Sequence, residues 1–197
     1  LDVSNWDTSS NTDLGAAFQN CRALKTLDVS NWDTSNVTGL AYAFYGCQSL
    51  AELDVSGWDM SNVKTIKQMF YNCTSITTLD VSDWDVSNVE NMNQTFCRCK
   101  SLTGVETTDW NTGKVTDMTY MFYECFNLES VDVSGWDVRN VTRLKGTFHS
   151  CYKLNGLDVS NWDTSFAGDI LVGNTAMTIG QTISVGNGGY TLELKDE

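Results

Sequence analysis

The chain contains no proline, a single histidine, and 12 lysine and arginine residues against 25 aspartate and glutamate residues. Without proline, stiff linkers between separate modules are not expected, and a regular array fits better. With His149 as the sole histidine, we expect no histidine metal cluster and no histidine-based catalytic triad. Phosphate loops, nucleophile elbows and dinucleotide fingerprints are missing too. The sequence therefore does not predict an enzyme.

Basic charge and long apolar runs are also scarce. The formal net charge of −13 repels phosphate backbones, so we expect no nucleic-acid partner. No stretch approaches about 18 consecutive apolar residues, so we expect no membrane insertion of this part of the protein. Because 41% of its 197 residues are hydrophobic, the chain can still bury a sizeable core. Partners are expected to be neutral, basic or cationic, divalent metal ions included.

What the chain does have is a repeat. Tryptophan recurs every 26 residues, as Trp6, Trp32, Trp58, Trp84, Trp110, Trp136 and Trp162. Cysteine keeps the same period, as Cys21, Cys47, Cys73, Cys99, Cys125 and Cys151, with Cys97 as the one extra. A constant period of this length is the signature of a stacked repeat architecture. It predicts a repeat domain over residues 1–165, with seven strands and six complete repeats.

Two shorter periods operate inside each repeat. In residues 27–30, apolar leucine and valine alternate with aspartate and serine, which predicts a short strand with one buried face. In residues 40–47, apolar positions recur at i, i+3, i+4 and i+7, which predicts a short helix or 3₁₀ segment. The polar residues 33–36 between them are typical of a turn.

The period is lost from about Phe166 onward. Residues 178–185 and 190–194 are β-like, and the glycine-rich residues 186–189 separate them, which predicts a hairpin. We interpret residues 166–197 as a β-rich cap over the last hydrophobic layer, because stacked repeats need a polar end. The start of an adjacent domain is the alternative.

The repeat carries a family resemblance. Residues 24–32 read Leu-x-x-Leu-x-Val-x-x-Trp, which fits the leucine-rich-repeat frame. Residues 37–50 read Val-Thr-x-Leu-x-x-Ala-Phe-x-x-Cys-x-x-Leu, which resembles the BspA-like (Treponema-type) class of these repeats. Over residues 1–165 the chain resembles bacterial surface proteins of the BspA type, the DUF285 group.

The resemblance implies an α/β repeat solenoid, a right-handed leucine-rich-repeat-like coil with one short strand and one short helix or 3₁₀ segment per repeat. It also implies a bacterial cell-surface or secreted protein that acts in adhesion or host-molecule binding. We therefore expect an extracellular location, as part of a longer chain. The family brings no common catalytic residues. A passive stalk that displays a neighbouring domain is the alternative function.

Outward-facing strand positions predict the binding site. The predicted sheet-face strip consists of Asp28, Ser30, Asp54, Ser56, Asp80, Ser82, Glu106, Asp132, Ser134 and Asp158. Such a strip suits a host or extracellular protein with a basic surface, a glycan, or calcium; no other cofactor is expected. Alternatively, carboxylates spaced about 5 Å apart only keep an exposed sheet soluble. Because stacked like charges repel, we expect compensation by serine and backbone hydrogen bonds or by cations.

Further columns of the repeat have expected structural roles. The carboxylates after the tryptophans, such as Asp33 and Asp59, are expected to accept backbone N–H groups in turns, and Asn111 in the same column agrees with that. The tryptophans are expected to be buried with hydrogen-bonded indoles, a sugar-binding platform being the alternative. The periodic cysteines are expected to be small buried residues, with disulfides as the alternative. Tyr45 and Tyr71 are expected nearer the surface.

Overall fold

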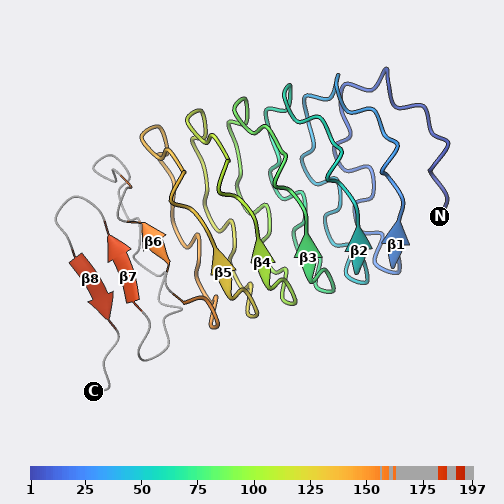
Figure 1. The fold of residues 1–197 in the computed structure, drawn as a ribbon. Helices are drawn as coiled ribbons and strands as arrows, with labels where there is room; N and C mark the ends of the chain where they lie inside the picture. Colours follow the sequence, from blue (N-terminus) through green and yellow to red (C-terminus); the bar gives the residue numbers. More distant parts are fainter. Residues whose placement is uncertain (156, 160–161, 163–181, 186–189, 194–197) are drawn as a thin grey trace.

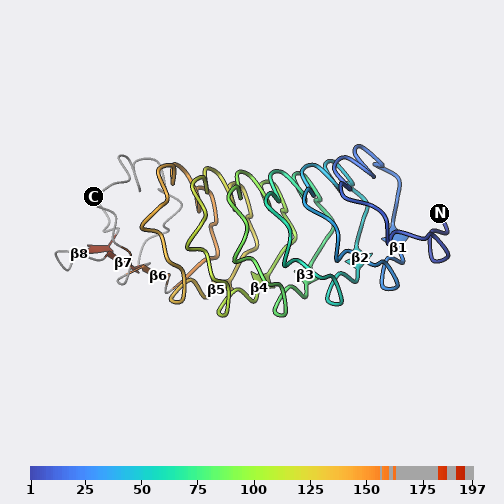
Figure 2. The same ribbon diagram turned by 90° about the horizontal axis from the view of Figure 1, so that it is seen from above.

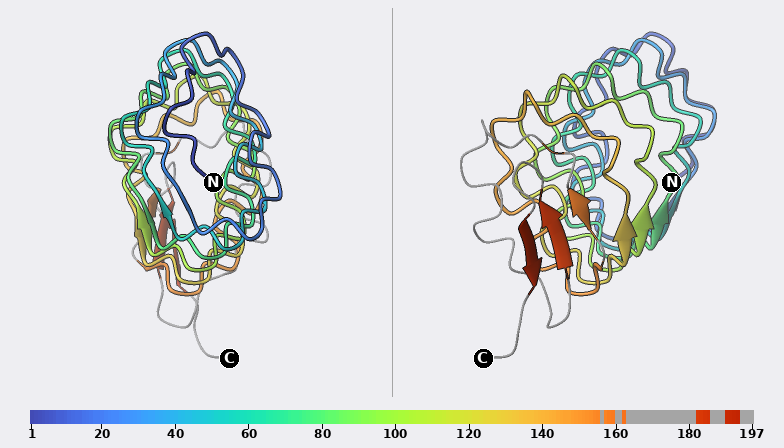
Figure 3. Two further views of the ribbon diagram at one scale, coloured as in Figure 1. Left: turned by 90° about the vertical axis from the view of Figure 1, so that its right-hand side faces the viewer. Right: turned by 60° about the vertical axis from the view of Figure 1, so that its left-hand side comes forward.

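The computed structural model describes residues 1–155, 157–159, 162, 182–185 and 190–193. Successive 26-residue repeats form coils that stack in sequence order from the N-terminus, with their short strands along one side (Figure 1). Seen from above, the coils form a single row (Figure 2). Viewed along the row, they overlap as elongated loops around a shared interior (Figure 3). The repeat in the sequence is therefore a repeat in space.

Parallel strands join neighbouring coils at constant register. The strands of the repeats are β1 (Thr26–Leu27), β2 (Glu52–Leu53), β3 (Thr78–Leu79), β4 (Gly104–Val105), β5 (Ser130–Val131) and β6 (Asp158–Val159). Thr26 pairs with Glu52, and Gly104 pairs with Ser130, each 26 positions apart. By hydrogen bonding, β1 and β2 form one sheet and β3, β4 and β5 another. Each of these strands spans two residues and is shorter than the predicted one; β1 to β5 end before Asp28 and its equivalents, whereas β6 contains Asp158.

The predicted helix or 3₁₀ segment is wrong: the described residues contain no helix. Over residues 40–47 the backbone amides alternate between two acceptors. Ala43 N donates to Leu40 O in its own coil at 3.2 Å, whereas Phe44 N donates to Met69 O of the next coil at 2.9 Å. Tyr42 and Gly46 adopt φ values of +63° and +71°, which no right-handed helix allows. The apolar spacing thus belongs to a chain of tight turns.

The left-handed backbone recurs in every described coil, mostly at residues other than glycine. It is found at Ala16, Asn20, Tyr42, Gly46, Gln68, Asn72, Gln94, Arg98, Tyr120, Glu124, Gly146 and Ser150. At the ten of these residues that are not glycine, the left-handed conformation costs about 1–2 kcal/mol each. The cost is offset because these turns direct every second N–H toward the neighbouring coil, where it finds a carbonyl partner.

The core consists of columns of identical side chains that run along the row. Phenylalanine rings of neighbouring coils stack at centroid distances of 5.1–5.6 Å, from Phe18 to Phe148. The tryptophans from Trp32 to Trp162 are buried, and the predicted burial is confirmed. Trp6 is 54% exposed, since only its inner face packs on Trp32 at 6.0 Å. Each coil buries its apolar face against its neighbours, so stability is shared along the row.

The cysteine column is buried and reduced, as predicted. All seven cysteines are free, and only Cys21 is half-buried. Each thiol from Cys47 onward in the periodic column lies 3.1 Å from a phenylalanine carbonyl oxygen of the preceding coil, as Cys99 does from Phe70 O. These residues act as small apolar side chains with a weak donor.

The last described strands continue the sheet beyond the sequence period. Strand β7 (Thr182–Val185) pairs parallel with β6, with Asp158 opposite Ser184 and so again 26 residues apart. Strand β8 (Tyr190–Glu193) pairs antiparallel with β7. The remainder of the predicted cap, including residues 163–181 and 186–189, lies outside the described residues, so its capping role stays a prediction.

Candidate functional site

The strip is built from a local motif that follows each strand. In the first such coil, Leu27 and Val29 are buried, whereas Asp28 and Ser30 are exposed. Ser30 donates both its backbone N–H, at 3.2 Å, and its hydroxyl, at 2.7 Å, to Oδ1 of Asp28. A short polar side chain that accepts an amide two residues ahead closes a turn. The alternation of buried and exposed side chains thus places the carboxylate on the surface, and the turn bonds hold it there.

The same pair of bonds recurs along the row. Oδ1 of the aspartate accepts from the serine two residues ahead at Asp2, Asp54, Asp80 and Asp132 as well. Glu106 departs from the pattern, and the hydroxyl of Thr108 donates to Oδ2 of Asp132 at 3.2 Å. The predicted compensation by serine and backbone hydrogen bonds is therefore confirmed. For Asp158, the equivalent partner is residue 160, which lies outside the described residues.

These bonds favour the charged form of two carboxylates of the strip, Asp54 and Asp132. The hydroxyl and backbone N–H of Ser56 lower the pKa of Asp54, in that order of size, and those of Ser134 lower the pKa of Asp132. A hydrogen bond to the charged form stabilises that form. In Asp28, Asp54 and Asp80 the serine bonds use Oδ1, so the second carboxylate oxygen is left to contact a partner.

Two shallow depressions lie along the strip. One, of about 300 Å³, is lined by residues of the second and third coils that include Asp28, Glu52 and Asp54. The other, of about 240 Å³, is lined further along by residues that include Asp132 and Asp158. Both present carboxylates from neighbouring coils to the same space. Two carboxylates on one concave surface suit a lysine or arginine side chain.

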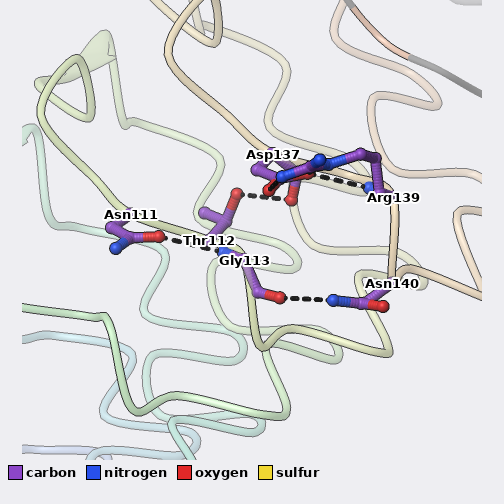
Figure 4. A network of polar contacts seen from close by, with 6 residues as sticks. All are labelled: Asn111, Thr112, Gly113, Asp137, Arg139 and Asn140. Carbon is purple, nitrogen blue, oxygen red and sulfur yellow. Dashed lines mark hydrogen bonds and ion pairs between the residues drawn. The ribbon is translucent and has the colours of Figure 1, made fainter.

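The second acidic column is structural, as predicted. Asp33 Oδ1 accepts the N–H and hydroxyl of Ser35 at 3.0 and 2.6 Å. Figure 4 shows the same turn in two neighbouring coils further along the row: Asn111 Oδ1 accepts the N–H of Gly113 at 3.2 Å, and Asp137 Oδ1 accepts the N–H of Arg139 at 3.1 Å. Asparagine therefore closes this turn without charge.

Neighbouring turns of this column are also tied together. Asn140 Nδ2 donates to the carbonyl oxygen of Gly113 at 2.7 Å, and the hydroxyl of Thr112 donates to the carbonyl oxygen of Asp137 at 3.0 Å (Figure 4). Each bond joins two coils, 27 or 25 residues apart. The column therefore holds neighbouring coils together, and Asp33 and Asp59 are not candidates for the binding site.

The sequence of the repeat matches a known family. The family model described as "Mycoplasma protein of unknown function, DUF285" matches residues 1–107 and 94–171, which together span most of the chain. The chain belongs to the DUF285 family. No curated protein matches it. The DUF285 repeat, as the structure shows it, thus combines a short strand, an Asp–Ser turn and a stack of tight turns.

The described part of this DUF285 chain contains no cluster of side chains that could hold a metal ion. Among those residues, no three or more histidine, cysteine, aspartate or glutamate side chains gather in an arrangement suited to a metal ion. The strip carboxylates are instead arranged in a row along the coils.

Among the residues that the structure describes, there is no helix long and apolar enough to cross a membrane.

A second candidate site was missed by the sequence analysis. A pocket of about 250 Å³ is lined by Tyr71, Gln94, Cys97, Arg98, Tyr120 and Tyr123. Tyr45 and Tyr71 are half-buried and stack at 4.6 Å, whereas Cys97 in the same column is fully buried. The expectation for Tyr45 and Tyr71 concerned only their position nearer the surface. The sequence feature that could have indicated the pocket is Cys97, a small residue in a column of aromatic residues.

Proposed function

We propose that this chain is a non-enzymatic binding module that holds a partner with a basic surface against its sheet-face strip. The observation that carries the proposal is the row of exposed carboxylates at constant 26-residue register, in which the serine two residues ahead holds the aspartate in place. Such a row presents one sign of charge over several coils, which steers and orients an oppositely charged partner.

The available side chains support binding rather than catalysis. His149 is the only histidine. Burial raises the pKa of the Cys47 thiol to about 11 and that of the Cys97 thiol to about 12, so these thiols are poor nucleophiles at neutral pH. The carboxylates repeat identically from coil to coil, which suits an extended contact surface more than one reaction centre.

The finer fold belongs to the same proposal: a leucine-rich-repeat-like solenoid of the BspA type. Its support is the alternation of buried Leu27 and Val29 with exposed Asp28 and Ser30, and the parallel pairing of successive coils. In such solenoids the residues of the short strands line an extended surface on which partners bind. We propose a cell-surface or secreted location for a bacterial protein of this kind, with a host or extracellular protein or glycan as partner.

The test is a binding screen against immobilised extracellular-matrix proteins and glycans, followed by charge-neutral variants. The double variant Asp54→Asn, Asp80→Asn keeps the oxygen that accepts from Ser56 and Ser82 but removes two charges. We expect binding to weaken by about tenfold, because two ion pairs at a partly hydrated interface are lost.

The matched control is the double variant Asp59→Asn, Asp85→Asn. These carboxylates close turns in the structural column and accept from Ser61 and Ser87, so the chemical change and the charge change are the same. Binding should be unaffected in the control. Equal losses in both double variants would contradict the assignment to the strip.

A passive stalk is the second candidate function. It is favoured by continuity along the row: the phenylalanine stack passes through every coil from Phe18 to Phe148 without a break. A stalk would bind nothing in the screen and would tolerate the strip variants. Retained function of the longer protein after replacement of the strip would favour it.

A further inference from the structure

One column of side chains on the molecule carries rings that stack from coil to coil, with one ring missing. The column follows the buried phenylalanines and consists of Gln19, Tyr45, Tyr71, Cys97, Tyr123 and His149. Tyr45 and Tyr71 stack at 4.6 Å between centroids, and Tyr123 and His149 stack at 5.2 Å. Between these two pairs stands Cys97, which has no ring.

The missing ring leaves a slot of one ring's thickness. Coils joined by parallel strands lie about 4.8 Å apart, so two coils separate Tyr71 from Tyr123 by about 9.6 Å along the row. A pocket of about 250 Å³ lies at this point, with Cys97 among its lining residues and Tyr120 at its side. Its volume is slightly below the range of about 300–1,000 Å³ found for drug-sized ligands, which suits a ligand of one ring.

Hydrogen-bond donors line the same pocket. Gln94 accepts from Gln68 Nε2 through Oε1, so its two amide N–H donors are what it can offer a ligand. The guanidinium of Arg98 lies over the ring of Tyr71, 5.9 Å from its centroid, and its Nε lies 3.2 Å from Oε2 of Glu124. The Nε–H is buried and not aligned with that carboxylate, so among the described residues it has no hydrogen-bond acceptor.

We propose that this slot binds a neutral pyranose ring at the end of a glycan. The ring of Tyr123 packs against one C–H face of the sugar, Tyr71 with the Arg98 guanidinium over it bounds the other side, and Gln94 and Arg98 donate to the sugar hydroxyls. Glu124 already neutralises Arg98, and the chain carries a net charge of −13, so an acidic sugar is disfavoured. An aromatic side chain would fill the slot but would leave the buried Nε–H of Arg98 unpaired, at a cost that a hydroxyl-bearing ring does not incur.

The test is saturation-transfer NMR of the whole chain with methyl glycosides of neutral hexoses and N-acetylhexosamines. We expect at least one glycoside to receive saturation on its ring protons. Cys97→Tyr places in the slot the same tyrosine ring that the neighbouring coils carry at this position, and it should abolish the signal. Cys97→Ala is the matched control, because it removes the same thiol while leaving the slot open, and it should retain the signal.

A second variant covers the case in which Cys97→Tyr does not fold, as judged by its circular dichroism. Gln94→Ala removes amide donors on the pocket wall and should weaken binding by about fivefold, the effect of one net hydrogen bond. No signal from any glycoside with the unsubstituted chain overturns the proposal. So does a signal that persists in folded Cys97→Tyr, or stronger binding of phenol than of every glycoside.

The result is independent of the proposed strip function. Asp54→Asn with Asp80→Asn should leave the glycoside signal unchanged, because these carboxylates do not line the pocket. If the unsubstituted chain binds a glycoside but no basic partner, only the strip proposal fails, and if it binds a basic partner but no glycoside, only the slot proposal fails.

Discussion

Trp84 donates its indole N–H to the carbonyl oxygen of Val55, 29 residues earlier, over 3.0 Å. The same bond joins Trp32 to Val3, Trp58 to Val29, Trp110 to Val81, Trp136 to Thr107 and Trp162 to Val133. Each tryptophan thus contributes a large apolar ring to its own coil and a hydrogen bond to the coil before it. This explains why the residue recurs at one position without a shift.

Replacing this tryptophan should be costly only where the bond exists. Trp84→Phe leaves the carbonyl of Val55 without its donor and leaves a small cavity, so we expect a loss of about 2–4 kcal/mol in the free energy of unfolding. Trp6→Phe, at a ring that is 54% exposed, should cost less than about 1 kcal/mol. Urea unfolding measures both. Equal losses would mean that the indole bond does not matter.

Two glycines should respond in opposite ways to alanine. Gly46 has φ +71°, and a Cβ there would lie 2.7 Å from Oδ1 of Asn20, so Gly46→Ala should cost about 1–2 kcal/mol. Gly104 lies in β4, where the nearest atom to an added Cβ is 3.6 Å away. Gly104→Ala should leave stability unchanged or raise it by up to about 1 kcal/mol. Thermal unfolding of the two variants compares them, and a costlier Gly104→Ala would contradict the backbone description.

Alkaline pH should destabilise the fold through the cysteine column. Burial raises the pKa of the Cys47 thiol from 9.0 to about 11 and that of Cys151 to about 12. A raised pKa in the folded state contributes stability below the unfolded value, and this stability is lost as the pH rises through the folded value. The melting temperature should therefore fall between about pH 9 and pH 11. Cys47→Ala should show a smaller fall than the unsubstituted chain.

Acid should destabilise it through the Asp–Ser turns. The hydroxyl and then the backbone N–H of Ser35 lower the pKa of Asp33 below 3.8, and Ser9 does the same for Asp7. A lowered pKa contributes stability above the unfolded value, which is lost as the pH falls through the folded value. The melting temperature should drop below about pH 4, and the double variant Ser9→Ala, Ser35→Ala should drop less steeply. An unchanged slope in that variant would argue against the turn bonds.

Much of the architecture could be predicted because each coil repeats the same local chemistry. The burial of Trp84 followed from its place in an apolar frame, and the burial of Cys99 followed from its period. The turn at Asn111 followed from the ability of asparagine and aspartate to accept the same backbone N–H. These features depend on residues near one another in sequence, so a single repeat contains the information.

The errors arose where neighbouring coils decide the structure. The apolar spacing of residues 40–47 suits a helix, but the next coil supplies carbonyl partners to alternate amides, and that favours left-handed residues such as Tyr42. Nothing in the chemistry of tyrosine predicts a positive φ. The slot at Cys97 was missed for the same reason, because it exists only between rings two coils apart.

The central claim is that the sheet-face strip is the binding surface. Backbone amide NMR of the chain, titrated with a lysine-rich peptide, tests it most directly. We predict that the shifts concentrate at Asp28, Asp54, Asp80 and Asp132 and their serines, and that they diminish as salt is raised. Shifts concentrated in the turns of Asp33 and Asp59, or spread evenly over both acidic columns, would contradict the account.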